Sequence, residues 1–312
     1  RIYLIKQVLE GRTATAKTQL HLDRCLTCRS CETTCPSGVQ YGRLVEIGRA
    51  AVHAQVGRSA WSSLKRMALR AVIPYRARFT ALLRLGQMVR WLLPPALKRT
   101  VPARARCGQW PTNRHARTML VLEGCAQPAL SPNTNVAAAR VLDRLGISLL
   151  RAPAASTVAE YGHLLAADPV YAEKAARVSA LMKDISEVIA AESPRIKTLA
   201  QNDSRRAPQT YAFHPPCSLQ HGLKMKGRVE VLLTDLGFEL TPIADSHLCC
   251  GSAGTYSILQ PELSQRLLQN KIAAIHAGHP ASIITANVGC HLQTATGLPV
   301  THWIEALDDR LA

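Results

Sequence analysis

Four cysteines fall within eleven residues near the start of the chain, and their spacing constrains the fold more than any other feature. The run reads Cys25-x-x-Cys28-x-x-Cys31-x-x-x-Cys35 and is followed by Pro36. This spacing is typical of bacterial ferredoxin loops that hold an iron–sulfur cluster. Short gaps let a tight loop aim several thiolates at one small object, and the proline cannot extend a helix beyond the last one. The run predicts an iron–sulfur site, whereas structural zinc usually needs two separated Cys-x-x-Cys pairs.

A second set of cysteines is spread over the last third of the chain. It comprises Cys217, Cys249, Cys250 and Cys290, with 31 residues between the first two and 39 between the last two. The adjacent pair is too close for an unstrained disulfide, because neighbouring Cα atoms lie about 3.8 Å apart. Gly251 permits the backbone conformation that aims both thiolates at one metal centre. We expect a second cluster here, with buried structural thiols as the alternative.

The composition is that of a globular protein that keeps its cysteines reduced. At 312 residues the chain is long enough for about two domains, and hydrophobic residues make up 47% of it. The ten cysteines are clustered and follow no signal peptide, so we expect cytoplasmic thiols rather than a disulfide framework. Arginines interrupt the longest apolar stretches before they reach the roughly 20 residues that span a bilayer.

A basic segment over residues 57–117 holds fourteen lysines and arginines and no acidic residue, so it accounts for most of the net charge of +17. Pro74, Pro94, Pro95 and Pro102 divide it into short amphipathic pieces. Such a segment indicates contact with an acidic partner subunit or an anionic membrane surface, or else a solvated linker. Nucleic acid is not expected, because no nucleic-acid-binding signature accompanies the charge.

From residue 118 onward short apolar segments alternate with amphipathic ones, which predicts an α/β fold with a mostly parallel sheet. The preceding region is predicted to be a small helical ferredoxin-like module. The expected regions are the module at 1–56, the basic linker at 57–117, a first α/β repeat at 118–205 and a second at 206–312. The expected strands are 119–122, 147–150, 210–213, 238–242 and 281–286, and the expected helices are 2–9, 44–56, 132–145, 171–191, 226–236, 261–277 and 302–311.

The two α/β repeats share one order of features. In each, a strand is followed by a cysteine, a helix, a Leu-Gly pair and another strand, with Cys125 in the first repeat and Cys217 in the second. The cysteines fall where strands end. This is the edge at which parallel sheets place their sites.

Six strings of residues resemble one known family. They are Arg1–Gln7, Cys25–Pro36, Leu122–Pro128, Ser246–Tyr256, Thr285–Cys290 and His302–Glu305. They make the chain similar to the cysteine-rich CCG proteins, which include heterodisulfide reductase subunits and lactate-utilisation proteins. Within that group the chain resembles the iron–sulfur subunits of bacterial glycolate oxidase nearly end to end.

The resemblance implies a subunit that carries electrons and has no catalytic residues of its own. In that family a separate flavin subunit oxidises glycolate to glyoxylate, and the iron–sulfur subunit passes electrons towards a quinone-type acceptor. The implied cofactors are one or two [4Fe–4S] clusters, held by Cys25, Cys28, Cys31 and Cys35 and by Cys217, Cys249, Cys250 and Cys290. The expected location is the cytoplasm, peripherally on the inner face of the inner membrane, with residues 57–117 as the contact.

The sequence departs from the family pattern at its start. The family has two ferredoxin-type runs, and the first of them would precede Arg1. The chain also begins with residues that are typical of the middle of a helix. We therefore expect an N-terminal truncation. In two-run proteins the fourth cysteine of each run serves the other cluster. The three leading cysteines of this run would keep their cluster and need another fourth ligand, with Cys35 as the substitute.

The first α/β repeat also departs from the pattern, because it lacks its own Cys-Cys-Gly. We expect Cys125 to be an orphan, and we expect an internal deletion where Arg151–Ser156 runs directly into Thr157–Gly162. Cys290 is followed directly by His291, which we expect to be a surface or loop residue and not a ligand.

Cys107 is expected to be a free thiol in the basic segment, and His214 and His247 flank cysteine loops where they can hydrogen-bond cluster sulfur. No G-x-G-x-x-G follows a strand, so no flavin or nicotinamide site is visible. Three alternatives stay open: an iron–sulfur subunit of another CCG-type oxidoreductase acting on lactate or a heterodisulfide, a zinc-stabilised interaction module, and a partly disabled copy.

Overall fold

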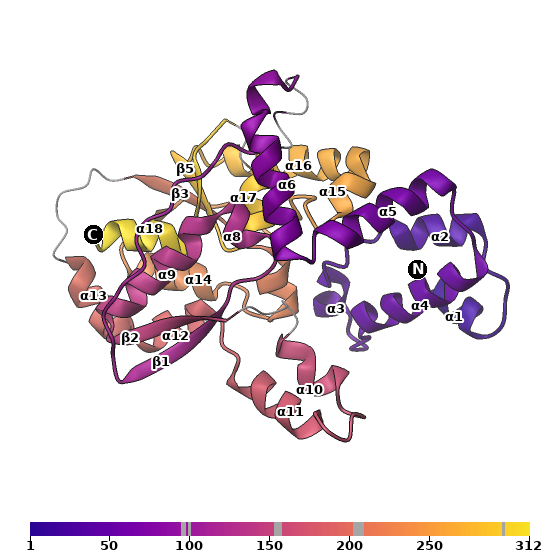
Figure 1. Ribbon diagram of the computed structural model, residues 1–312, viewed down its shortest axis with the longest axis horizontal. Coiled ribbons are helices and arrows are strands. Elements are labelled where there is room, and N and C mark those ends of the chain that lie inside the picture. Colours follow the sequence, from indigo (N-terminus) through magenta and orange to yellow (C-terminus); the bar gives the residue numbers. More distant parts are fainter. Residues whose placement is uncertain (95–97, 99–100, 153–157, 202–208, 295–296) are drawn as a thin grey trace. The chain divides into compact units, whose positions relative to one another are not determined.

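The computed structural model describes residues 1–94, 98, 101–152, 158–201, 209–294 and 297–312 (Figure 1). The chain divides into two compact units, each built from segments that are distant in the sequence. Unit 1 comprises Arg1–Leu69 and Ala207–Trp303, and unit 2 comprises Arg70–Arg206 and Ile304–Ala312. The ferredoxin-type run and the second cysteine set therefore belong to the same unit.

The first part of unit 1 consists of short helices around the ferredoxin-type run. They are α1 (Ile2–Leu9), α2 (Ala16–Asp23), α3 (Ser30–Thr34), α4 (Tyr41–Gln55) and α5 (Ala60–Val72). Apolar side chains of α1, α2 and α4, among them Ile5, Leu22 and Val45, are almost fully buried in one cluster. The predicted helix over 2–9 is confirmed, and the helix after the cysteine run begins slightly earlier than predicted, at Tyr41.

The second part of unit 1 is a four-stranded sheet whose strands all run parallel, in the order β4-β3-β5-β6. The strands are β3 (Thr210–His214), β4 (Glu239–Leu240), β5 (Ser282–Thr285) and β6 (Val300–His302). The connecting helices are the π-helical turn η3 (Ser218–Gly222), α14 (Arg228–Asp235), α15 (Tyr256–Leu259), α16 (Pro261–His276) and α17 (Val288–Thr294). Ile283 and Ile284 of β5 are fully buried, as expected for a central parallel strand covered on both faces. The predicted α/β class is confirmed.

The carboxyl ends of the two central strands lie side by side (Figure 1). His214 ends β3 and pairs with Thr285 at the end of β5, and Thr285 Oγ1 donates a 2.9 Å hydrogen bond to the His214 carbonyl oxygen. Cys217 follows β3 and Cys290 follows β5. Because these strands are adjacent and parallel, both cysteines leave the sheet at the same edge.

Unit 2 contains a smaller parallel pair, β1 (Arg117–Leu122) and β2 (Ile147–Ala152), joined through α9 (Pro132–Arg144). The same order of strand, helix, Leu-Gly pair and parallel strand recurs as β3, α14 and β4 in unit 1. Gly146 and Gly237 both have left-handed backbone, with φ of 74° and 80°, which lets each Leu-Gly pair end its helix and turn into the next strand.

The remaining elements of unit 2 are helical. They are α6 (Arg76–Met88), η1 (Arg90–Leu92), α8 (Gln127–Leu130), η2 (Val158–Glu160), α10 (Tyr161–Leu164), α11 (Ala172–Leu181), α12 (Ile185–Ala191), α13 (Ser193–Gln201) and, from its second residue, α18 (Trp303–Arg310). The prediction of one helix over 171–191 is wrong, because Asp184 starts a new helix. Its carboxylate accepts from the Ser186 N–H, and the Glu187 carboxylate accepts from the Asp184 N–H, both at 2.9 Å. This reciprocal cap favours a fresh start of the helix over continuation.

A buried carboxylate ties the last helix of the chain to α9. Asp308 has only 4% of its side chain exposed and forms ion pairs with Arg140 and Arg144 of α9. The Arg140 Nε atom lies 2.7 Å from the Asp308 carboxylate, and Arg144 Nη1 lies 3.0 Å from it. The C-terminal segment is thereby fixed within unit 2.

The first part of the basic segment is helical, with α5 and α6 on either side of Pro74, and its described residues 101–116 are not helical. Pro95 and the expected deletion site beyond Ala152 lie outside the described residues. Among the helices that the structure describes, none combines the length and the apolar character needed to cross a membrane.

Candidate metal centres

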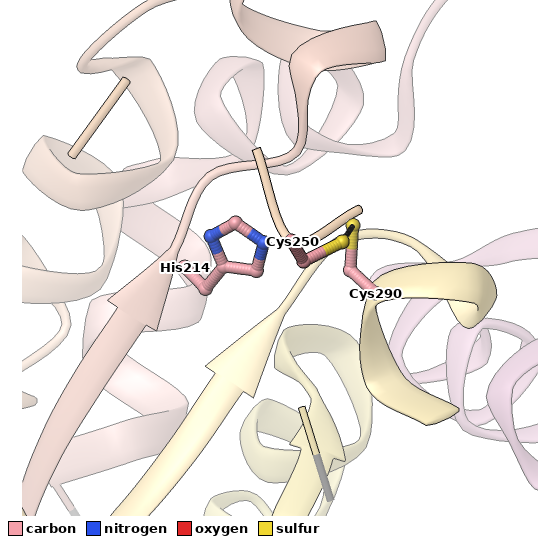
Figure 2. A group of neighbouring side chains, drawn as sticks. All are labelled: His214, Cys250 and Cys290. Carbon is pink, nitrogen blue, oxygen red and sulfur yellow. Dashed lines mark hydrogen bonds between the residues drawn. The ribbon is translucent and has the colours of Figure 1, made fainter. Parts of the chain in front are cut away.

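The four cysteines of the second set converge at the carboxyl edge of the unit 1 sheet. The Cys250 and Cys290 sulfur atoms lie 3.3 Å apart (Figure 2). Cys249 is hydrogen-bonded to Cys217 on one side and to Cys250 on the other. The thiols therefore form one continuous row in the order Cys217, Cys249, Cys250, Cys290. The structure thus brings together all four residues that the sequence predicts as ligands of the second cluster.

Three separate loops deliver these cysteines. Cys217 immediately precedes the π-helical turn η3, and the adjacent pair lies in the loop before α15. Cys290 lies in the first turn of α17, where the Asn287 side-chain oxygen accepts the Gly289 N–H at 2.8 Å. Cys250 and Cys290 are 2% and 6% exposed, so two of the four sulfur atoms are shielded from water.

Gly251 shapes the loop of the adjacent cysteines. Its φ is +80°, a value that side-chain-bearing residues rarely adopt, and a Cβ there would lie 2.4 Å from the backbone oxygen of Ser264 in α16. Its N–H donates to the Cys249 sulfur at 3.3 Å. Only glycine can therefore bring α16 this close to the loop while its amide supports a thiolate.

The protonation pattern of the row favours metal binding. Hydrogen bonds from Cys217 and Cys250 lower the pKa of Cys249 to about 3, and a hydrogen bond from Cys250 lowers the pKa of Cys290 to about 6. The same contacts raise the pKa of Cys217 and of Cys250. The mutual hydrogen bonds of the row thus favour the thiolate form of Cys249 and Cys290. Because the thiolate is the form that binds metals, the donor set fits an iron–sulfur cluster.

His214 adds a buried ring to this centre. Its side chain comes from the end of β3, and its nitrogen lies within 4.8 Å of the Cys250 and Cys290 sulfur atoms (Figure 2). The residue is 1% exposed, and a hydrogen bond between its ring and the Cys290 thiol is among the causes that lower the pKa of that thiol. A buried histidine in this position can hydrogen-bond the sulfur of a bound cluster. His247, by contrast, is exposed.

The ferredoxin-type run forms a loop with two left-handed residues. Thr27 and Arg29 have φ of 55° and 61°, which curls the chain between successive cysteines. The Thr27 N–H donates to the Cys25 sulfur at 3.4 Å. Arg49 of α4 holds the loop from behind, since its guanidinium donates to the carbonyl oxygens of Leu22 and Cys25 at 2.9 Å and 2.7 Å.

Three of the four cysteines in this run influence one another, and the fourth stands apart. Burial, together with the other thiols of the run, raises the pKa of Cys28 and Cys31, and Cys25 acts on both. The pKa of Cys35 is lowered by the backbone N–H groups of residues 37–39, and no cysteine contributes to its shift. In their electrostatic setting the first three cysteines therefore form a group, and Cys35 differs from them.

The two cysteine sets are close enough to influence each other within unit 1. Cys249 contributes to the raised pKa of Cys28, and Cys28 contributes to that of Cys217. Thr33 of α3 and His221 of η3 share a 2.8 Å hydrogen bond between Oγ1 and Nδ1. This contact joins the ferredoxin-type run to the turn that follows Cys217, so the two sets lie near each other.

The two remaining cysteines belong to unit 2. Cys125 is half-buried after β1, and Cys107 is exposed. Neither belongs to a group of potential metal ligands among the described residues, and Cys107 stays a predicted free thiol.

Three residues near the centres carry no sequence signal that identifies them. Lys271 lies inside α16 and is fully buried beside the second set. Tyr256 donates to the Arg24 carbonyl oxygen at 3.4 Å, and its pKa is raised by burial, with Cys25 and Cys249 both contributing. Arg49 supports the first loop. Only the unusual placement of Lys271 on an apolar helix face could have pointed to it.

Comparisons with known proteins agree with this geometry. The family model for the cysteine-rich domain, CCG, matches residues 211–294, which contain the whole second set. The chain is 44% identical to the "Glycolate oxidase iron-sulfur subunit" of Escherichia coli (strain K12), over all of this chain and 87% of that protein. It is 27% identical to the "Probable glycolate oxidase iron-sulfur subunit" of Bacillus subtilis (strain 168), over 96% of this chain and 82% of that protein.

A more distant similarity is found with "Lactate utilization protein A" of Geobacillus thermodenitrificans, which is 28% identical over 50% of this chain and 66% of that protein. The similarity to the Escherichia coli protein is higher and extends over the full chain. On that evidence, the chain belongs to the family of glycolate oxidase iron–sulfur subunits.

Proposed function

We propose that this chain is the electron-carrying iron–sulfur subunit of a glycolate oxidase. The observation that carries the proposal is the row of four thiols at the sheet edge, in the domain that matches the cysteine-rich family and in a chain 44% identical to the Escherichia coli subunit. A [4Fe–4S] cluster bound there would supply reversible one-electron chemistry. The residues that would hold it are Cys217, Cys249, Cys250 and Cys290.

The protein's own contribution is to hold the ligands and to keep water away. The Gly251 amide supports the Cys249 thiolate, and the buried positions of Cys250 and Cys290 exclude solvent from half of the row. The buried His214 ring lies beside Cys250 and Cys290, where it can hydrogen-bond a ligand sulfur atom. These features fix the ligand geometry and lower the local dielectric, which are the means by which proteins tune iron–sulfur centres.

A second centre at Cys25, Cys28 and Cys31 completes the proposed carrier. These residues lie in the same unit as the second set, and Cys28 and Cys249 act on each other electrostatically. The arrangement supports transfer of single electrons within unit 1. The fourth ligand of this centre comes from outside Cys25–Cys31, and the separate setting of Cys35 makes an external donor the better fit.

We assign the oxidation of glycolate to a separate flavin subunit, with electrons passing from it through this chain towards a quinone-type acceptor. The name of the Escherichia coli relative describes a subunit, which supports assembly into an oxidoreductase complex. The proposal gives this chain no catalytic residue, so the chain alone would not turn over glycolate. Oxidation of glycolate by the isolated chain would contradict that assignment.

Helix α5 is the surface that we propose for contact with an anionic membrane. Two of its three basic residues also make contacts within the protein: Arg66 pairs with Asp23 at 3.1 Å, and Lys65 donates to the Ile258 carbonyl oxygen at 2.7 Å. The third, Arg70, is exposed, and so are the apolar side chains of Trp61 and Met67, at 74% and 61%. Exposed tryptophan and methionine on one helix with an exposed arginine suit an anionic lipid interface, and the protein would then be cytoplasmic and peripheral on the inner membrane.

Sedimentation with vesicles tests this contact. Wild-type protein is expected to sediment with vesicles that contain anionic lipid and to stay in solution with neutral ones. The double variant Trp61→Ser/Met67→Ser should lose most of this binding. Equal sedimentation of the wild type and the variant would overturn α5 as the contact.

The similarity to lactate-utilisation proteins favours one second candidate, an iron–sulfur subunit that serves lactate oxidation. Affinity purification from the native host separates the two. A glycolate-oxidising flavoprotein in the purified complex supports the first proposal, and a lactate-oxidising partner supports the second.

Metal analysis tests the cofactor proposal directly. Anaerobically purified protein is expected to be brown, with about eight irons and equal sulfide per chain if both centres hold [4Fe–4S] clusters, and about four if one does. The reduced protein should show the EPR signals of such clusters. A colourless protein with zinc and no sulfide would overturn the electron-transfer proposal and leave a zinc-stabilised module.

A further inference from the structure

Lys271 occupies a position that lysine rarely takes. It lies on the buried stripe of α16 with Leu268 and Ile275, and its exposure is 0%. Lysine is almost never fully buried unless a partner compensates its charge, because removing an ammonium group from water is costly. Among the described residues, however, no carboxylate forms an ion pair with it.

The surroundings of the ammonium group are the cysteine loop itself. Its Nζ atom donates a 2.9 Å hydrogen bond to the carbonyl oxygen of Ser246, which precedes the adjacent cysteines. One face of α16 is held against the same loop, since Ser264 Oγ donates to the Gly251 carbonyl oxygen at 2.9 Å. Of the groups that raise the pKa of Lys271, Cys250 contributes most, then Cys290 and Cys249, with Asp245 contributing least; burial outweighs them and lowers it to about 8. The side chain therefore remains mostly charged at neutral pH.

We propose that Lys271 is a positioning residue whose buried positive charge stabilises the reduced form of the cluster held by Cys217, Cys249, Cys250 and Cys290. This inference rests on the proposed function, because it requires an iron–sulfur cluster at that site. Reduction adds negative charge to a centre with few water molecules around it, so a fixed cation nearby stabilises the reduced state more than the oxidised state. The charge thereby raises the reduction potential of this cluster and makes it the better electron acceptor.

The test is a redox titration followed by EPR, on the full chain with its clusters bound. Lys271→Gln keeps a donor for the Ser246 carbonyl oxygen and removes the charge, Lys271→Met removes both, and Lys271→Arg keeps the charge. The exposed lysine of the same domain gives the matched control Lys224→Gln. EPR spectra of Cys25→Ser and Cys249→Ser variants assign each signal to its cysteine set.

We expect Lys271→Gln and Lys271→Met to lower the equilibrium constant for reduction of the second-set cluster at least tenfold. For one electron this equals a fall of about 59 mV in the reduction potential. The reduction potential of the Cys25–Cys31 cluster should shift much less. In Lys271→Arg and Lys224→Gln the equilibrium constant for reduction of the second-set cluster should stay within about threefold of the wild-type value. Lys271→Gln protein with full iron content and the wild-type potential would overturn the inference while leaving the proposed function intact.

The two failures are distinguishable in the wild type. Suppose that the wild type holds one cluster, which Cys25→Ser loses and Cys249→Ser keeps. Then the second set binds no cluster. This result would overturn both the inference and the proposed cluster at Cys217, Cys249, Cys250 and Cys290. If Lys271→Met fails to fold, Lys271→Gln with its retained hydrogen bond still decides the question.

Discussion

Ser264 Oγ donates a 2.9 Å hydrogen bond to the carbonyl oxygen of Gly251, and the Ser264 backbone oxygen occupies the space that a Cβ on Gly251 would need. Helix α16 and the loop of adjacent cysteines are therefore fitted to each other at backbone level. The side of α16 that makes this contact also carries the buried Lys271. One close approach thus sets the position of two ligands and of the buried charge beside them.

Replacement of Gly251 by alanine should disrupt the second centre. The new Cβ would lie 2.4 Å from the Ser264 oxygen, in addition to the cost of about 1 kcal/mol for a left-handed residue. We expect Gly251→Ala to lose most of the iron of the second cluster and to lower the melting temperature. Gly254→Ala is the matched control, because Gly254 also has positive φ but open space around it. Equal iron content in the two variants would contradict this account.

The separate setting of Cys35 predicts unequal effects within the first run. Cys28→Ser removes a thiol that Cys25 and Cys31 both influence, so it should abolish the first cluster and reduce the iron content by about half in a two-cluster protein. Cys35→Ser should leave most of that iron in place. Iron and sulfide analysis of the two purified variants makes the comparison. Loss of the first cluster in Cys35→Ser would show that Cys35 is the fourth ligand after all.

The lowered pKa of Cys249 predicts that it reacts with alkylating agents in mildly acidic solution. In the metal-free protein its pKa is about 3, compared with an ordinary value of 9.0, so above about pH 3 it is a thiolate. At pH 6 iodoacetamide should label Cys249 faster in the folded chain than in the chain unfolded by urea, where the thiol is protonated. Cys250, whose pKa is raised, should stay unlabelled. Mass spectrometry of tryptic peptides measures both; faster labelling of Cys249 after unfolding would contradict the hydrogen-bonded row.

The buried carboxylate of unit 2 predicts a stability effect unrelated to any cluster. Asp308→Asn leaves Arg140 and Arg144 without their charge partner, and both arginine side chains are about a quarter exposed. Breaking a fully buried ion pair would lower the free energy of unfolding by roughly 3–5 kcal/mol. Because these arginines are partly exposed, we expect a loss of about 1–3 kcal/mol. Urea unfolding measures the loss, with the exposed Asp309→Asn as control. An unchanged free energy of unfolding would contradict the prediction, because it would mean that hydrogen bonds to water fully compensate the lost ion pairs.

Local signals in the sequence were sufficient for most elements of the fold. The Leu-Gly pairs, the periodic apolar residues of Pro261–His276 and the apolar runs of the strands each depend on neighbours in the chain, and all were found close to their predicted bounds. Strand β6 (Val300–His302) and helix α2 (Ala16–Asp23) were not predicted, and the region around Asp184 was predicted wrongly. There, apolar periodicity continues through the break, and the reciprocal cap that interrupts the helix is a short-range hydrogen-bond pattern with no effect on that periodicity.

By itself, the sequence determined which cysteines are candidate metal ligands, because ligand spacing and adjacent Cys-Cys-Gly are properties of the linear chain. It also determined the alternation of strands and helices and the family to which the chain belongs. Only the tertiary structure decided that the two cysteine sets lie in one unit, that backbone N–H groups surround the Cys35 thiol and that a lysine is buried beside the second set. These facts depend on contacts between segments up to about two hundred residues apart in the chain, such as Thr33 with His221, and no local pattern encodes such contacts.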